Sequence, residues 1–268
     1  QGVAGMIDAI HQSMVGMWLR CGLQFQYRYL DGNVMPPSIK ARTGSAVHKA
    51  AEINNQHKIT AHEDLPLDVL QDAARDEYVR LLKDEGVFIP RDQLPEKARI
   101  INDNLNDAIG ATGAYRSEVA PKVQPIFAEK SATVDIGLDL PIAGKLDTGT
   151  IEGVRDIKVQ GITRNQAWAD AEIQPDFYWH LYKEITGAYP QSFTYDALVT
   201  LKSGVKYNPL VTRRSTSLTR IRQYCAILLR DIQTGHFRPA DPESWACSPT
   251  WCGWWQTCPH GARSRIIL

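Results

Sequence analysis

The spacing of apolar residues changes near residue 125 and divides the chain into two parts of different character. Before that point, apolar side chains recur every three or four residues, as in amphipathic helices. After it, short runs bounded by turn-forming residues indicate strands, with helices among them. The expected helices span 5–30 (one or two helices, with a break at Gly22), 41–57, 66–85, 95–118, 163–171, 174–186 and 217–234. The expected strands are three within 126–158, one at 193–201 and one at 206–212.

This order of elements predicts an α/β domain in which helices flank a central mixed sheet. A helical insertion covers residues 60–120, and residues 240–268 form an irregular tail rich in cysteine and tryptophan. We expect a single domain over residues 1–268, although a chain of this length can also hold two small ones.

Charge and composition narrow the range of partners. The chain has 30 Lys and Arg and 30 Asp and Glu, so a polyanion must be bound by a local basic patch. No apolar run approaches the ~20 residues of a membrane span, so we expect no membrane partner. Asp8, His11 and Arg20 interrupt the N-terminal stretch, which therefore does not read as a signal peptide. An odd cysteine count of 5 favours reduced thiols and a cytoplasmic location.

The most informative stretch is 144–158, where two short runs flank a turn near 151–153 and each run carries an aspartate. Side chains alternate along a strand, so Asp156 and Lys158 leave one face together. The turn would bring Asp147 opposite or diagonal to Asp156, roughly 5–8 Å away. The sequence therefore predicts two carboxylates and an amine on one side of a sheet.

Such a group suits a divalent metal and an activated water. Carboxylate oxygens hold Mg²⁺ or Mn²⁺, and the backbone carbonyl of Ile157 would supply a further ligand. The metal lowers the pKa of a bound water, and Lys158 can orient that water. The alternative is that both aspartates are ordinary turn or edge residues.

Two helical motifs are further candidates. Gly44 and His48 lie four residues apart on one helix face, so a neighbouring segment can approach the imidazole closely. Gln174 and Tyr178 share a face at the start of a later helix, where they would contact a phosphate or a base. The alternatives are a histidine with an ordinary hydrogen bond and an ordinary helix start.

Taken together, these motifs resemble the RecB-like branch of the PD-(D/E)XK nuclease superfamily. That branch includes the nuclease domains of RecB and AddB, CRISPR adaptation nucleases and many phage exonucleases. Order and spacing agree from about residue 20 to residue 187. The matching motifs are Gly-x-x-x-His (Gly44 to His48), Gly-x-x-Asp (Gly144 to Asp147), Asp-x-Lys (Asp156 to Lys158) and Gln-x-x-x-Tyr (Gln174 to Tyr178). The resemblance implies a restriction-endonuclease-like core.

The resemblance also implies roles for single residues. By it, His48, Asp147 and Asp156 are metal ligands and Lys158 assists the attacking water. Glu129 stands where the branch often has a further acidic residue.

A DNA path is implied as well. By the resemblance, the helix of Gln174 and Tyr178 lies near DNA. Arg28 and Arg42, close in sequence to the histidine helix, would pair with phosphates unless they belong to a solvated charged face. Further candidates of the same kinds are Arg20, Lys40, Arg213, Arg214, Arg220 and Arg222 for phosphates and Tyr27, Tyr29 and Trp179 for bases.

Some members of the branch fasten the C-terminal tail to the N-terminal region with a 4Fe-4S cluster. Cys21 and the later trio Cys247, Cys252 and Cys258 fit that layout, although their spacing departs from the AddB-type pattern. Four thiolates can hold an iron–sulfur cluster or a tetrahedral Zn²⁺, or they can be plain buried thiols. Cys225 lies within an expected helix and is typical of a core residue.

These observations predict a Mg²⁺- or Mn²⁺-dependent DNA nuclease, more readily an exonuclease than an endonuclease. The pathway would be DNA recombination, DNA repair, or phage or CRISPR processing. The partner would be DNA, with an oligomer or a recombination protein also compatible. The rival interpretation is a non-catalytic DNA-binding scaffold that keeps the nuclease fold.

Overall fold

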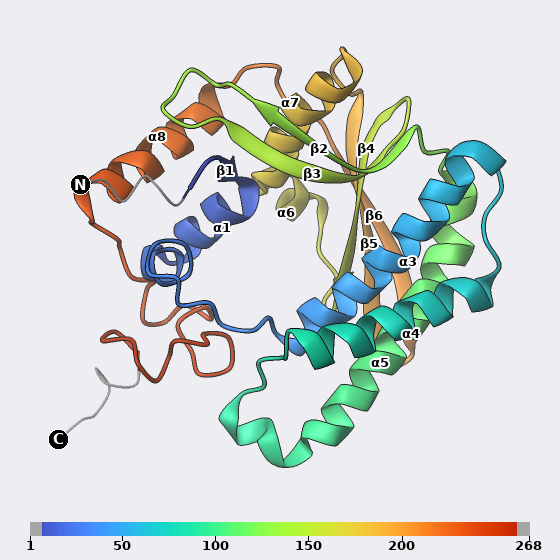
Figure 1. Cartoon of the computed structure of the whole chain (residues 1–268), viewed down its shortest axis with the longest axis horizontal. Helices are drawn as coiled ribbons and strands as arrows, with labels where there is room; N and C mark the ends of the chain where they lie inside the picture. The colour runs from blue at the N-terminus through green and yellow to red at the C-terminus, as the bar shows by residue number, and fades with distance from the viewer. Residues whose placement is uncertain (1–6, 262–268) are drawn as a thin grey trace.

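Six strands form one mixed sheet with helices packed around it (Figure 1). The computed structural model describes residues 7–261, so residues 5 and 6 of the first expected helix and residues 262–268 of the tail lie outside the described residues. The strands are β1 (Ile10–His11), β2 (Phe127–Val134), β3 (Ile142–Gly149), β4 (Gly153–Gln160), β5 (Ser192–Leu201) and β6 (Gly204–Thr212). The α-helices are α1 (Gln12–Arg20), α2 (Gly22–Phe25), α3 (Ile39–Ala61), α4 (Leu67–Asp84), α5 (Lys97–Ala114), α6 (Gln166–Ala171), α7 (Gln174–Thr186) and α8 (Thr219–Thr234).

The predicted class, an α/β fold with a central mixed sheet, is confirmed by this architecture. The expected break at Gly22 is present, because Cys21 is extended between α1 and α2. The two-residue strand β1 was not expected, since a run that short has no periodicity to detect. Among the described residues, no helix combines the length and the apolar character that a membrane crossing requires.

The two central strands separate at the candidate site. β3 pairs antiparallel with β2 along its length. On its other edge, β3 pairs with β4 only through Thr148–Arg155 and Gly149–Val154, and with β1 through Ile142 and Ala143. Beyond them, β4 runs parallel to β5, and β5 is antiparallel to β6. Asp147 and Asp156 are therefore the first residues past the last β3–β4 pair.

A tight turn closes the β3–β4 hairpin. The amide of Thr150 donates to the carbonyl of Gly153 at 2.8 Å, and the amide of Gly153 donates back at 3.2 Å. Gly153 has a φ of +152°, and a Cβ at this position would lie 2.0 Å from the carbonyl oxygen of Ser192. Only glycine lets the turn approach β5 this closely, and this contact fixes where both strands begin.

Two apolar clusters cover the sheet. The larger joins the sheet to α1, α7 and α8. The second joins α3, α4 and α5 to Ile157 and Leu198. α3 presents Ala46, Val47 and Ala50 to this second cluster, and these small side chains let the helix lie close to the sheet. Both clusters consist of buried apolar side chains, so close packing holds α3 against the strands.

The described part of the tail lies against the N-terminal segment, as the red and blue ribbons of Figure 1 show. The amide of Gly22 donates to the carbonyl of Arg238 at 2.8 Å. Trp254 donates its indole N–H to the carbonyl of Asn33 at 3.1 Å, and Gln24 donates to the carbonyl of Ala246 at 3.3 Å.

Candidate active site

Three acidic residues occupy neighbouring positions across β2, β3 and β4. We call Glu129, Asp147 and Asp156 the acidic row. Glu129 lies between the pairs Ala128–Thr148 and Lys130–Leu146, which places it opposite Asp147. Asp147 and Asp156 follow the last β3–β4 pair, so they face each other where the strands part. The amide of Ile157 is not used in pairing with β3, and it donates to Asp147 Oδ2 at 3.4 Å.

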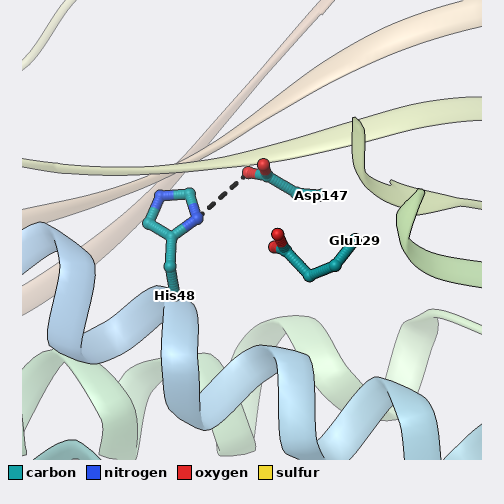
Figure 2. Close-up of side chains that lie close together, drawn as sticks. All are labelled: His48, Glu129 and Asp147. Carbon is teal, nitrogen blue, oxygen red and sulfur yellow. Dashed lines mark ion pairs between the residues drawn. The ribbon is translucent and has the colours of Figure 1, made fainter. Parts of the chain in front are cut away.

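α3 brings a histidine to the same place. His48 Nδ1 lies 3.1 Å from Asp147 Oδ2. Figure 2 shows the imidazole rising from the helix toward Asp147, with the carboxylate of Glu129 beside the pair. One ligand atom from each of these residues lies within 4.8 Å of the others. In the described part of the chain, this is the one group of three or more His, Cys, Asp or Glu side chains that meets so closely.

Asp156 lies outside that group and is held by its own partners. Asp156 is buried, with only 1% of its surface exposed. Gln174 donates to Oδ1 at 2.6 Å, and Lys158 Nζ lies 2.6 Å from Oδ2. Although Oδ2 is paired with the ammonium, it accepts no hydrogen bond of ordinary geometry from the described residues. This buried oxygen therefore keeps unused acceptor capacity.

Gly144 explains how α7 reaches this region. A Cβ on Gly144 would lie 2.8 Å from Leu181 Cδ1 and 3.5 Å from Tyr178 Cε1. Without that Cβ, α7 packs directly on β3, and Gln174 at its first turn lies within reach of Asp156. The glycine of the Gly-x-x-Asp motif therefore has a packing role here.

The charges of the pair His48–Asp147 stabilise each other. Burial lowers the pKa of His48, but the charge and hydrogen bond of Asp147 and the charge of Asp156 outweigh it and raise that pKa from 6.5 to about 9. Burial raises the pKa of Asp147, but His48 and Lys158 outweigh it and hold the pKa below its usual value. Without a metal, the imidazolium is the counter-ion of the carboxylate.

Asp156 and Lys158 form a second ion pair, in which the carboxylate is buried and the ammonium is partly exposed. Burial raises the pKa of Asp156 to about 6, and the charge of Lys158 only partly offsets this effect. Burial lowers the pKa of Lys158, but the charges of Asp156 and Asp147 outweigh it and raise that pKa. The ammonium lies 5.7 Å from the ring centroid of Tyr195, within range of a cation–π contact. Lys158 is therefore a cation fixed against the acidic row.

Glu129 has an unusual backbone. Its φ is +52°, in the left-handed region that costs a residue with a side chain on the order of 1–2 kcal/mol. Burial raises the pKa of its carboxyl group, partly offset by an ion pair with Lys145. The strained conformation directs a half-buried acid toward Asp147 and His48, as Figure 2 shows.

The donor set suits a hard or borderline divalent cation. Carboxylate oxygens and one imidazole nitrogen are ligands that Mg²⁺ and Mn²⁺ accept. His48, Glu129 and Asp147 already converge, and Oδ2 of Asp156 has unused acceptor capacity nearby. A cation there would also neutralise three adjacent acids whose burial is otherwise costly.

Not every residue predicted to contact DNA is exposed. Arg42 is 3% exposed and donates to the carbonyl of Gly86 at 2.8 and 3.0 Å and to Glu85 at 2.8 Å. It is a structural residue, so its prediction as a phosphate contact is wrong. Tyr178 and Gln174 are also buried, and Gln174 donates a hydrogen bond to Asp156. Arg28 remains partly exposed.

The four cysteines from the two chain ends line one cavity. Cys21, Cys252 and Cys258 are buried, and no disulfide is formed. Their sulfur atoms do not meet the 4.8 Å spacing that the histidine–acid group meets. A tetrahedral zinc with ~2.3 Å bonds would bring four sulfurs within about 3.8 Å of one another. Cys225 is fully buried in α8, as expected of a core residue.

Two contributors to the site had no detectable sequence signal. Tyr195 lies beside Lys158 because β5 pairs with β4 in register, Asp156 opposite Tyr195. Lys145 reaches Glu129 across β2 and β3. Both are ordinary strand residues in the sequence, and only cross-strand register reveals them.

A family model described as the PD-(D/E)XK nuclease superfamily matches residues 12–259. The fold is similar to the crystal structure of an Eubacterium rectale protein described as "Putative exonuclease", with a TM-score of 0.60. That alignment has 12% sequence identity and covers 97% of this chain and 89% of the other, so it supports the fold alone. The sheet and its flanking helices are the expected restriction-endonuclease-like core. A comparison with curated proteins found no match.

Proposed function

This chain belongs to the PD-(D/E)XK nuclease superfamily, and we propose that it is a Mg²⁺- or Mn²⁺-dependent deoxyribonuclease of the RecB-like branch. The observation that carries this proposal is the acidic row across β2, β3 and β4, with His48 on one side and Lys158 on the other. A bound divalent cation would supply Lewis-acid activation of water and charge neutralisation at phosphate.

The residues of the chain have separate tasks in this proposal. His48, Glu129 and Asp147 would hold the metal, and Asp156 and the carbonyl of Ile157 would complete its ligands. Lys158, fixed by Asp156 at 2.6 Å, orients the attacking water and stabilises charge developing on the phosphate. Gln174 is a positioning residue, because it holds Asp156 at 2.6 Å from within the protein.

We favour an enzyme that acts at DNA ends. The motif order resembles that of the RecB-like branch, and the protein of similar fold is described as an exonuclease. An endonuclease remains the competing activity, and a DNA-binding scaffold without cleavage is the competing function. The intact acidic row and Lys158 favour catalysis over the scaffold, because a scaffold has no use for costly buried charges.

One set of assays separates these functions. The protein is incubated with Mg²⁺ or Mn²⁺ and either linear or covalently closed circular DNA. Release of nucleotides from linear DNA alone supports an exonuclease, whereas nicking of circles indicates an endonuclease. DNA binding without cleavage in any divalent ion would leave only the scaffold.

Matched variants tie the activity to the site. Asp147→Asn and Glu129→Gln keep the side-chain shapes but remove charge, and both should abolish cleavage while the thermal unfolding curve stays cooperative. Glu152→Gln, at an exposed position of the hairpin turn, is the control and should cleave normally. Full activity of Asp147→Asn would remove the basis of the proposal.

We also propose that Cys21, Cys247, Cys252 and Cys258 bind a 4Fe-4S cluster, with Zn²⁺ as the alternative. Support comes from four thiols, brought together from distant parts of the chain, that line one cavity. Anaerobically purified protein should be brown with a broad visible absorption band, and Cys252→Ala should remove the band. A colourless protein with bound zinc would favour the alternative.

A further inference from the structure

A groove of about 470 Å³ lies between the N-terminal segment and the tail. One wall comes from Met17, Arg20, Arg28 and the segment 35–38, and the other from the tail tryptophans. The hydrogen bond from Trp254 to Asn33 and the packing of Gly253 on Met35 hold the walls together.

Two tryptophans of this groove are unusually exposed. Trp245 is 59% exposed and Trp251 is 57% exposed, and their rings meet edge to face with centroids 5.8 Å apart. Exposing this much aromatic surface is unfavourable unless a ligand covers it. Flat aromatic faces that are open to solvent are the stacking platforms on which unpaired bases bind.

The charged side chains that line the groove are all positive. Arg20 and Arg28 line it, and no acidic side chain of the described residues does. The guanidinium of Arg20 lies 5.8 Å from the ring centroid of Trp245, and that of Arg28 lies 5.6 Å from the ring of Tyr29. Within residues 7–261, neither arginine forms an ion pair with a carboxylate. Both can therefore pair with an anion.

One edge of the groove lies at the start of the helix that carries His48. Ser38 and Ala41, at the start of α3, line its edge. His48 lies ten residues after Ser38 in the same helix, roughly 15 Å along the axis at 1.5 Å per residue. At 3.4 Å per nucleotide of a stacked strand, that distance is about four nucleotides.

We propose that this groove binds unpaired nucleotides of single-stranded DNA, with Trp245 and Trp251 stacking on bases and Arg20 and Arg28 pairing with phosphates. The choice of DNA rests on the proposed deoxyribonuclease function. The arginines favour this polyanion over an apolar protein segment, which would leave both cations unpaired in the groove.

Binding is measured by fluorescence anisotropy with a labelled oligothymidylate of about 16 nucleotides, the upper site size of single-strand binding folds. EDTA is present, so cleavage does not interfere. The double variant Trp245→Ala/Trp251→Ala should bind more weakly by at least roughly 5- to 150-fold, the loss expected for a single stacked base. Trp245→Phe/Trp251→Phe should restore most of the affinity, because phenylalanine keeps a stacking face.

The arginines are tested through salt dependence. In Arg20→Gln/Arg28→Gln, the slope of log affinity against log salt should fall by about 0.7 for each lost phosphate contact. Arg75→Gln, on the exposed face of α4 away from the groove, is the matched control and should keep the wild-type slope. In every groove variant, the affinity for a closed hairpin duplex should fall less than the affinity for the single strand.

The possible outcomes separate the two proposals. Equal affinity in the wild type and the alanine variant would overturn the groove proposal, as would a wild type that binds no single strand at low salt. A protein that binds the strand through the tryptophans but cleaves no DNA would uphold the groove and refute the nuclease. If the tryptophan-to-alanine variant lost more affinity for an oligouridylate than for the DNA strand, the groove would be specific for RNA and the choice of DNA would be overturned.

Discussion

The strained backbone of Glu129 gives a prediction that separates a functional residue from a structural one. Glu129→Gly should remove most of the left-handed penalty, on the order of 1–2 kcal/mol. Against this gain stand about 0.5–1 kcal/mol of glycine entropy and the ion pair with Lys145, about 0.2–1 kcal/mol because the lysine side of the pair is exposed. The variant should therefore stay within about 1 kcal/mol of wild-type stability, because these terms nearly cancel.

Metal affinity, in contrast to stability, should fall strongly in Glu129→Gly. Loss of even an outer-shell partner costs roughly 10- to 100-fold in metal affinity, so loss of the Glu129 carboxylate should cost at least as much. Urea unfolding of the metal-free protein gives the stability, and calorimetric titration with Mn²⁺ gives the affinity. Glu129→Gln separates the two effects, because it keeps the strained backbone and removes the charge.

The matched control is Lys130→Gly, at the next and more exposed strand position. Its backbone is not strained, so glycine there should cost about 0.5–1 kcal/mol and leave Mn²⁺ binding unchanged. If Glu129→Gly kept its Mn²⁺ affinity, the metal assignment would fail. A loss of stability clearly above about 1 kcal/mol would show that the backbone of Glu129 stores no strain.

Three further predictions concern the neighbours of this site. Gln174→Met removes the donor to Asp156, so the pKa of Asp156 should rise further and the acidic limb of the pH–rate profile should move to higher pH. Gly144→Ala should lose about 1–3 kcal/mol of stability through contact with Leu181, and a double-mutant cycle with Leu181→Ala should show less than additive losses. Because the pKa of His48 is raised from 6.5 to about 9, its contribution to metal-free stability is complete below pH 6.5 and lost as the pH rises through 9. In the proposed site the neutral imidazole would be the metal ligand, so Mn²⁺ affinity should increase over the same pH range with release of a proton. Calorimetry in buffers of different ionisation enthalpy detects this proton release, and His48→Asn should abolish it.

Local patterns in the sequence were sufficient for the elements that carry the site. The helix predicted over 41–57, observed as Ile39–Ala61, and the three strands after residue 126 follow from local sequence patterns and turn residues, which act over short distances. The facing of Asp147 and Asp156 also follows, because one tight turn fixes the register of a hairpin.

Other features depended on contacts between distant residues. Arg42 had the sequence character of a phosphate ligand, yet α3 buries it against Gly86. Trp245 and Trp251 lie in a tail without periodicity, and only its packing on the N-terminal segment forms a groove around them.

The sequence by itself determined the helices, the hairpin and the set of residues that we propose for catalysis, because these depend on neighbours a few positions apart. Tertiary structure alone decided that His48 meets Asp147 and Glu129, and that Gln174 holds Asp156. It also decided the left-handed backbone of Glu129. Such contacts arise from how α3 and α7 pack on the sheet, and that packing is determined by side chains throughout both apolar clusters.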